Sequence, residues 1–158
     1  MTPDPAPVVV ETHSPEQTEA LGRRLGGRLR AGDVVALAGP LGSGKTVLAR
    51  GIALGAGATG YIASPSFVVI REYAGPLRVY HVDLFRLERP EELDALGLEE
   101  LVDGTGVVIV EWADRAPGVL PREHVRVTCA FGSAATDRIL TFTAPASMAD
   151  RLDGTAGG

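Results

Sequence analysis

The segment GPLGSGKT (39–46) constrains this chain more than any other stretch, because it satisfies the phosphate-loop pattern G-x-x-x-x-G-K-[ST]. The preceding run DVVALA (33–38) is almost continuously apolar, which is typical of a strand buried on both faces. The following run TVLARGIALGAG (46–57) has the character of a helix. A chance match to this pattern in a chain of this length has odds of about one in a hundred or less. The sequence therefore predicts a strand, a phosphate-binding loop and a helix.

The residue types of the loop explain this prediction chemically. Glycines allow the backbone to wrap a phosphate with successive N–H groups, and the helix that follows points its positive end at the same phosphates. Lys45 reaches the outer phosphates, and the Thr46 hydroxyl is placed to ligate Mg²⁺. Lys45 is the only lysine, beside 14 arginines among the 15 basic residues. We interpret it as the one basic position where the wider guanidinium does not fit.

Two acidic residues follow apolar strand runs and are candidates for the acid that organises the metal. Asp83 follows LRVYHV, and Glu111 follows GVVIV. The alternatives are a helix cap or turn residue for Asp83 and a salt-bridge partner for Glu111. His81 lies two residues before Asp83 and on the same face of the strand. It could orient Asp83, contact the phosphates or make a structural hydrogen bond.

The segment SPEQTEALGRRLGGRLRAG (14–32) predicts an amphipathic helix near the start of the chain. Ser14 is a suitable N-cap, and Gln17 completes a capping box with it. Leucines at every fourth position from 21 to 29 form one apolar face. Gly32 is the expected stop signal.

The remaining pattern alternates strands with helices and predicts one α/β domain, namely a P-loop NTPase domain with a mixed, mostly parallel sheet flanked by helices. Residues 1–7 are expected to be a flexible N-terminus, 8–144 the domain, and 145–158 a mobile tail. The further expected elements are a strand at 8–12, a hairpin within 66–85, a helix at 89–103, a strand at 106–112, and an antiparallel pair at 124–131 and 137–144.

Composition limits the classes of partner and compartment. The net charge of −5 argues against a broad basic surface for nucleic acid. One cysteine, Cys129, excludes an internal disulfide and fits a reducing compartment, and its strand context predicts a buried thiol. No apolar run approaches a membrane span, and the first residues lack the features of a signal peptide. We expect a cytoplasmic protein.

Other nucleotide-binding classes have motifs that this sequence lacks or carries only in part. The guanine-selecting N-K-x-D motif is absent, since the chain contains no asparagine. A small-molecule kinase would need a lid with arginines, for which Arg115 and Arg122 are candidates on a short segment. ASPSF (63–67) offers Ser64 and Ser66 as sensors of the terminal phosphate, but the residues by themselves favour an ordinary S-P turn.

Several of these segments together resemble the bacterial TsaE (YjeE) family. The matching blocks are GPLGSGKT, SPSF, YHVDLFRL with PEELDALGLEE, and VEWADR followed by GVLP, in this order between about residues 33 and 122. The first block occurs in many P-loop proteins. H-x-D-L-[FY]-R followed by VEW is much more specific.

The resemblance implies a small ATPase that uses ATP and Mg²⁺ and acts with the TsaB–TsaD heterodimer in threonylcarbamoyladenosine modification of tRNA, with tRNA contacted indirectly or through the complex. By position, Thr46 and Glu111 would ligate Mg²⁺, with Asp83 in or just outside the metal shell, so that Lys45, Asp83 and Glu111 form the catalytic set. Ser66 stands where the family usually has threonine in a switch-like element, and Trp112 matches the family's E-W pair. Arg86 and Glu91 are candidates for the partner face. The phosphate-binding residues would be Leu41, Gly42, Ser43, Gly44, Lys45, Thr46 and Ser66.

Three functions follow as hypotheses: an ATPase motor for the tRNA-modifying complex, an ATP-dependent binding module without essential hydrolysis, and a small-molecule kinase. The sequence does not define the base contacts. As a conjecture, adenine lies between residues 12–17 and the last strands near Arg138.

Overall fold

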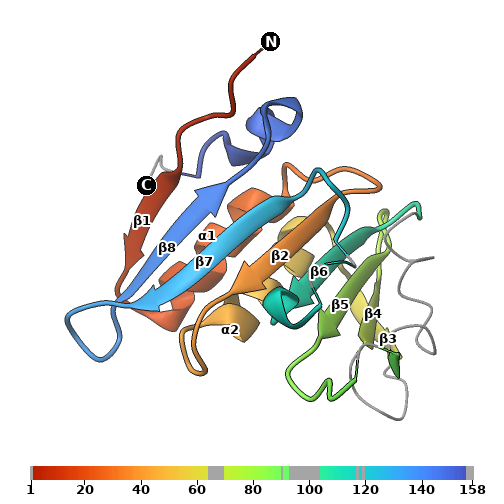
Figure 1. Cartoon of the computed structure of the whole chain (residues 1–158), viewed down its shortest axis with the longest axis horizontal. Helices are drawn as coiled ribbons and strands as arrows, with labels where there is room; N and C mark the ends of the chain where they lie inside the picture. The colour runs from red at the N-terminus through yellow and green to blue at the C-terminus, as the bar shows by residue number, and fades with distance from the viewer. Residues whose placement is uncertain are drawn as a thin grey trace.

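The computed structural model describes residues 2–63, 70–89, 91–92, 104–116, 118 and 120–155. These residues form a single eight-stranded sheet in the order β1-β8-β7-β2-β6-β5-β4-β3, shown in Figure 1. The elements are β1 Val8–Thr12, α1 Pro15–Gly26, β2 Val34–Ala38, α2 Lys45–Gly55, β3 Gly60–Ala63, β4 Ile70–Ala74, β5 Val79–Asp83, β6 Val107–Glu111, β7 Val125–Phe131 and β8 Arg138–Thr143, with 3-10 helices η1 Ala113–Arg115 and η3 Ala146–Leu152.

The sheet is mixed, and its parallel strands form the centre. Strands β7, β2, β6 and β5 pair in parallel, whereas the four other neighbouring pairs are antiparallel. The predicted hairpin is confirmed as β4–β5, and the predicted terminal pair as β7–β8. The expected mixed α/β sheet with helices is therefore confirmed. Its parallel pairs lie in the centre of the sheet and are fewer than its antiparallel pairs.

The first helix begins as predicted and ends earlier than predicted. The Gln17 N–H donates to the Ser14 hydroxyl over 3.1 Å, and the Gln17 side-chain oxygen accepts from the His13 N–H over 2.7 Å. The helix ends at Gly26, and Gly27 caps it with its N–H on the Arg23 carbonyl. The expected stop at Gly32 is wrong, because Gly32 lies in the turn before β2, where its φ is +90°.

Glycines allow α1 and α2 to pack backbone against backbone. A methyl group at Gly26 would lie 2.1 Å from the carbonyl oxygen of Ile52, and one at Gly55 would lie 2.1 Å from that of Arg23. Gly22 and Gly51 make similarly close approaches to the opposite helix. These four glycines explain why a short α1 fits tightly over the helix that follows the phosphate loop.

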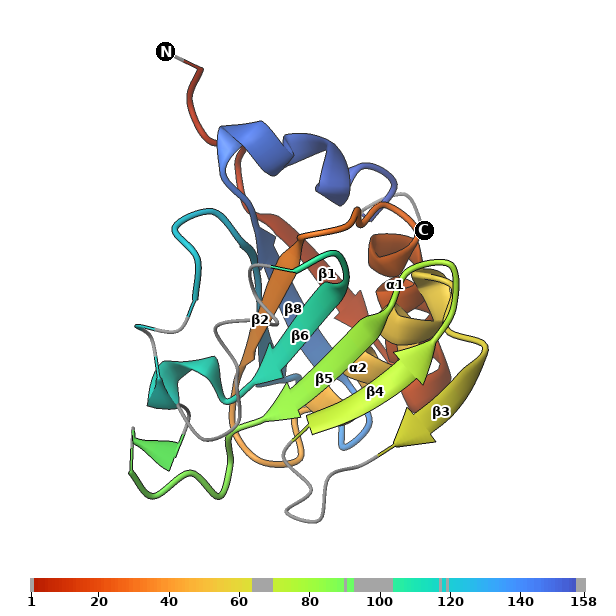
Figure 2. The ribbon, with the colours of Figure 1, turned by 90° about the vertical axis from the view of Figure 1, so that its right-hand side faces the viewer.

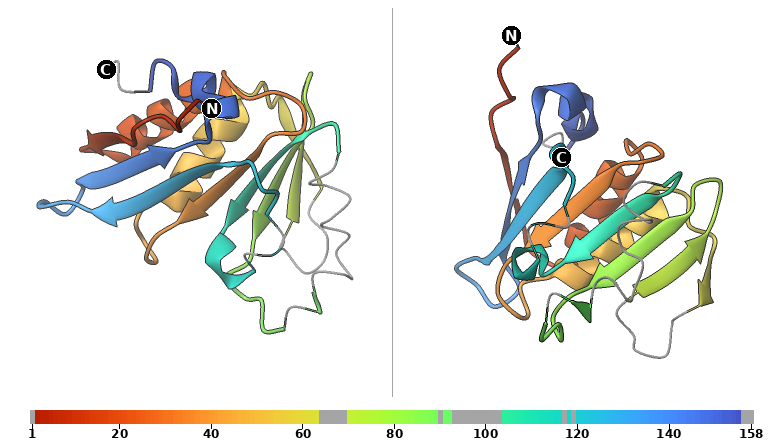
Figure 3. Two further views of the ribbon diagram at one scale, coloured as in Figure 1. Left: turned by 45° about the horizontal axis from the view of Figure 1, so that its top comes forward. Right: turned by 45° about the vertical axis from the view of Figure 1, so that its right-hand side comes forward.

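Both helices cover the same face of the sheet, as Figures 2 and 3 show. The main core lies between them and the sheet, with Leu25, Leu48 and Phe142 fully buried in it. A second core on the opposite face joins β2, β5 and β6 to Leu84 and the segment around Ala113 and Ala116. The central strands are therefore buried on both faces, which agrees with the continuous apolar run of β2.

The C-terminal segment differs from the expected mobile tail. Residues 146–152 form η3, which lies at the end of the sheet where the chain enters β2 (Figure 1). Met148 and Leu152 join the main core, and Arg151 donates to both carboxylate oxygens of Asp33 over 2.8 and 3.1 Å. The ion pair is buried and fixes the turn that leads into β2. The sequence did not predict this helix because one arginine and two apolar residues form no clear helical period.

Some predictions fall outside the described residues. These are the serines of the SPSF segment, Ser64 and Ser66, and most of the predicted helix at 89–103, of which 89, 91 and 92 are described. The flexible N-terminus remains a prediction. Within the described part of the chain, no helix has the length and apolar character needed to cross a membrane.

Candidate functional site

The loop between β2 and α2 has the backbone shape that its glycines predict. Gly39, Gly42 and Gly44 have φ values of +138°, +82° and +100°, a region that other residues rarely adopt. A methyl group at Gly39 would also lie 2.3 Å from the carbonyl oxygen of Cys129. The loop is therefore held against β7 and leads directly into the N-terminus of α2, where backbone N–H groups favour an anion.

Lys45 is buried at the start of α2 with its ammonium group inside the loop. Its Nζ donates to the carbonyl oxygens of Gly39 and Pro40 over 2.5 and 2.9 Å and lies 3.8 Å from the centroid of the Trp112 ring. Burial lowers the pKa of Lys45, and the negative charge of Glu111 opposes that change. A compact ammonium can be held by two carbonyls and one ring in this space, which supports the interpretation of the single lysine.

Glu111 ends β6 and contributes both carboxylate oxygens to polar contacts. Its Oε1 accepts a hydrogen bond from the Thr46 hydroxyl over 3.1 Å, and its Oε2 makes a short contact with Nε2 of His81. Glu111 and His81 are both buried. Glu111 is therefore joined to the phosphate loop through Thr46. Its position at the end of a strand suggested that it lies near the loop but did not identify this contact.

Asp83 occupies the equivalent position on the neighbouring strand. It is the register partner of Glu111 in the parallel pair β5–β6, so the two acids end side by side. Asp83 is half-buried, and its carboxylate accepts the backbone N–H of Phe85 over 2.9 Å. His81, for which a role in orienting Asp83 was one alternative, contacts Glu111 instead. His81 and Asp83 therefore have different partners, namely Glu111 for His81 and the Phe85 N–H for Asp83.

Two aromatic residues at this site were not predicted to contact it. Phe85 and Trp112 have ring centroids 5.1 Å apart, and the Arg115 guanidinium lies over both rings at 5.6 and 5.7 Å. Trp112 is half-buried beside the second core and has a left-handed backbone with φ 59°. A left-handed conformation costs a non-glycine residue energy. The turn directly after Glu111 was the only sequence signal that could have indicated this contact.

Together these residues line a cleft of about 270 Å³ beside the loop. Lys45, Thr46, Asp83, Glu111, Phe85 and Trp112 contribute to its walls. Mg²⁺ prefers oxygen ligands, and the Thr46 hydroxyl and the Glu111 carboxylate are already within 3.1 Å of each other. The donor set therefore fits a Mg²⁺ ion that is shared with the phosphates of a nucleotide.

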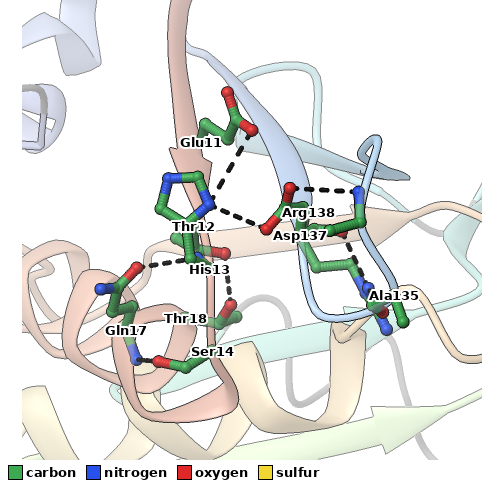
Figure 4. A network of polar contacts seen from close by, with 10 residues as sticks. Glu11, Thr12, His13, Ser14, Gln17, Thr18, Ala135, Asp137 and Arg138 are labelled. Carbon is green, nitrogen blue, oxygen red and sulfur yellow. Dashed lines mark hydrogen bonds and ion pairs between the residues drawn. The ribbon is translucent and has the colours of Figure 1, made fainter.

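A second hollow of about 140 Å³ lies on the other side of the loop. Its walls come from the corner after β1, from the loop itself and from the turn before β8: Ser14, Pro15, Thr18, Gly42, Gly44, Val47, Thr136 and Arg138. Gly42 and Gly44 line both hollows. Figure 4 shows the polar contacts of the corner after β1 and the turn before β8. Arg138 also donates to the Gly42 carbonyl over 3.2 Å.

A third hollow, of about 470 Å³, opens between α2 and the β4–β5 hairpin. It touches the candidate metal site through Thr46 and His81, and Arg50 and Arg71 line it as well. Apolar side chains of α2, including Val47 and Leu54, form another wall. This space is large enough for a small metabolite.

The family model for "Threonylcarbamoyl adenosine biosynthesis protein TsaE" matches residues 12–139. Among curated proteins, the tRNA threonylcarbamoyladenosine biosynthesis protein TsaE of Bacillus subtilis (strain 168) is 38% identical over 142 residues, which cover 89% of this chain and 88% of that protein. The TsaE of Mycobacterium tuberculosis (strain H37Rv) is 41% identical over 138 residues, covering 81% and 82%.

A solved structure supports the same relationship. The crystal structure of Bacillus subtilis YdiB superposes with a TM-score of 0.77 at 32% identity, covering 96% of this chain and 95% of that one. The family model spans the phosphate loop, both strand-end acids and Trp112. The chain belongs to the TsaE family of tRNA threonylcarbamoyladenosine biosynthesis proteins.

Proposed function

We propose that this protein binds ATP with Mg²⁺ and hydrolyses it as an accessory of a TsaB–TsaD complex that modifies tRNA. The observation that carries the proposal is the junction of loop and acid, where Thr46 of the phosphate loop donates to the buried Glu111. A metal bound by these two oxygens would neutralise the outer phosphates and position them for attack by water.

Each residue of the site has a role in this proposal. Lys45 leaves the carbonyls of its own loop for the outer phosphates, and the loop amides hold the phosphates from 41 to 46. Thr46 and Glu111 hold the metal, and Asp83, whose carboxylate already accepts the Phe85 N–H, supports it from the neighbouring strand. Adenine lies in the hollow between Ser14 and Arg138, which is contiguous with the loop through two shared glycines. Ser66 remains a candidate contact to the terminal phosphate.

Partner dependence follows from the charges around the cleft. No arginine is among the described residues that line it, and the nearby Arg115 guanidinium is stacked on Phe85 and Trp112. Phosphoryl transfer commonly needs an extra cation at the transition state, which a partner can supply. We therefore expect slow hydrolysis by the isolated protein and faster hydrolysis with TsaB and TsaD.

The first experiment is a pull-down with TsaB and TsaD, with and without ATP, followed by an ATPase assay on the complex. Stable association and a higher hydrolysis rate in the complex would support the proposal. Equal rates with and without the heterodimer would contradict the accessory role.

The alternative of a binding module without essential hydrolysis is tested by Glu111→Gln in a reconstituted tRNA-modification assay. If this variant binds ATP, fails to hydrolyse it and still supports many rounds of modification, hydrolysis is incidental. If modification stops after about one round, hydrolysis drives the reset of the complex.

The hollow beside Thr46 and His81 favours one second candidate, a small-molecule kinase. A metabolite bound there would lie next to the metal end of the nucleotide, and Arg50 and Arg71 would suit an anionic acceptor. A screen with γ-labelled ATP and no partner protein tests this function. Transfer of label to a metabolite would support it, and release of labelled phosphate alone would contradict it.

A further inference from the structure

The hollow proposed for adenine has walls from segments that are distant in the sequence. Ser14 belongs to the corner between β1 and α1, whereas Thr136 and Arg138 belong to the turn between β7 and β8 and to the start of β8. The loop glycines, together with Thr18 of α1 and Val47 of α2, complete the walls. Antiparallel pairing of β1 with β8, which sets Thr12 opposite Arg138, brings the corner and the turn together, and a side-chain contact can fix them further.

His13 and Asp137 make such a contact across 124 positions of sequence. Nδ1 of His13 lies 2.8 Å from Oδ1 of Asp137. The other oxygen of Asp137 accepts the N–H of Ala134 over 3.1 Å, and the backbone carbonyl of Asp137 accepts the N–H of Gly132 over 2.9 Å. Asp137 therefore closes its own turn and at the same time receives His13.

His13 is itself held in place on the other side. Its backbone N–H donates to the Gln17 side chain over 2.7 Å, within the capping network of α1 that Figure 4 shows. Glu11 places a second carboxylate oxygen 3.9 Å from Nδ1. The hydrogen bond to Asp137 raises the pKa of His13 and lowers that of Asp137, so the pair favours its charged form.

Arg138 connects this pair to the phosphate loop. Its guanidinium donates to the carbonyls of Ala135 and Asp137 over 2.8 Å each and to that of Gly42 over 3.2 Å. It also lies 5.0 Å from the centroid of the Phe131 ring. Since Arg138 directly follows Asp137, a shift of the turn would move the Arg138 wall of the hollow.

We propose that His13 is a positioning residue for nucleotide binding, which holds the β7–β8 turn through Asp137 and thereby shapes the wall that receives the base. Because His13 does not line the phosphate cleft, its substitution should affect the binding of ligands that contain a base and spare ligands that lack one. The proposal rests on the proposed function, because it requires a nucleotide whose base occupies this hollow.

The test compares the affinities of ADP and inorganic pyrophosphate by calorimetry in the presence of EDTA. EDTA removes metal ions that could bind the Glu11, His13 and Asp137 cluster. His13→Ala should weaken ADP binding about threefold to tenfold, because a partly exposed ion pair contributes modestly, and should leave pyrophosphate binding unchanged. His13→Lys keeps the positive charge and should restore most of the ADP affinity. His124→Gln is the matched control, since His124 bonds to the Pro121 carbonyl and is not among the described residues that line either hollow beside the loop.

The outcomes separate this inference from the proposed function. Equal ADP affinity in the wild type and His13→Ala overturns the positioning role, even if ATP hydrolysis is intact. Equal losses of ADP and pyrophosphate affinity overturn it as well, because they indicate damage to the loop rather than to the wall for the base. A wild type that binds pyrophosphate without preferring ADP overturns both proposals.

Discussion

The two ends of the candidate nucleotide site differ in how they exclude water. At the metal end, His81 and Glu111 are 6% and 2% exposed and contact each other between two parallel strands. At the base end, the side chains of His13 and Asp137 are 57% and 13% exposed, and their contact links two surface turns. A buried polar group that loses its partner pays its full desolvation cost, whereas water replaces a lost partner at the surface. Substitutions at the metal end should therefore have larger effects.

Lys45→Arg should have the largest effect, because Lys45 is buried and its ammonium lies inside the phosphate loop. The guanidinium is too wide for the space between the Gly39 and Pro40 carbonyls and the Trp112 ring. We expect ATP affinity to fall about 100-fold or more with an unchanged circular dichroism spectrum. Calorimetric titration measures the loss, and Arg24→Lys on the exposed surface of α1 is the reverse swap as a control. A fully active Lys45→Arg protein would refute the interpretation of the single lysine.

Glu111→Gln should separate hydrolysis from binding. The amide keeps the volume and can still contact Thr46, but it lacks the charge that a metal requires. Hydrolysis in the TsaB–TsaD complex should fall about 100-fold, while ADP affinity without metal stays within about threefold. Glu19→Gln, which removes a partly exposed charge paired with Arg23, is the matched control. Loss of ADP affinity without metal would show that Glu111 supports the loop rather than the metal.

The contrast between the two ends also explains how much the sequence could predict. At the metal end, the grouping of the loop and the two acids was predictable, because the carboxyl ends of neighbouring parallel strands meet at one edge of a sheet. The side-chain contacts there were not predictable, since the position of His81 and Asp83 on the same face of a strand does not reveal that His81 bonds to Glu111. At the base end, the conjecture around residues 12–17 and Arg138 agrees with the position of a hollow. The His13–Asp137 contact, however, depends on the register of β1 against β8.

The fold shows the same division between local and long-range information. The capping sequence before α1 and the apolar runs of β2 and β6 determine local structure, and these elements were predicted. The end of α1 depends on close packing of Gly26 against Ile52, and the ordering of η3 depends on an ion pair between Arg151 and Asp33. Both contacts join positions that are far apart in the chain.

His81 offers a test of intermediate size at the metal end. His81→Leu leaves one buried Glu111 oxygen without its partner, and His81→Gln can restore a donor. We expect hydrolysis to fall about 10-fold in the leucine variant, since groups that orient a metal ligand commonly contribute that much, and to recover partly with glutamine. Steady-state ATPase assays with TsaB–TsaD at several Mg²⁺ concentrations measure it. Identical rates in the two variants would show that His81 is only a packing residue.

Arg138→Ala probes the base end and should have a smaller effect. It removes the bond to the Gly42 carbonyl and one wall of the hollow. ADP affinity should fall about threefold to tenfold, because the side chain is partly solvated, while hydrolysis at saturating ATP stays near the wild-type rate. Calorimetry and saturation kinetics separate the two effects. A lower rate at saturation with unchanged ADP affinity would move Arg138 from the base to the reacting phosphate.

The smallest expected effect is the pH dependence of stability that arises from the His13–Asp137 pair. The pKa of His13 is raised above its ordinary value of 6.5, mainly by its hydrogen bond to Asp137, so folding favours the protonated form. This contribution is fully present below the unfolded pKa and disappears as the pH rises through the folded pKa. Wild type should therefore exceed His13→Ala in melting temperature more at about pH 5.5 than at about pH 8.5, as measured by calorimetry. A difference that stays constant with pH would mean that the neutral imidazole makes the contact, and the charge would then be irrelevant to the base end.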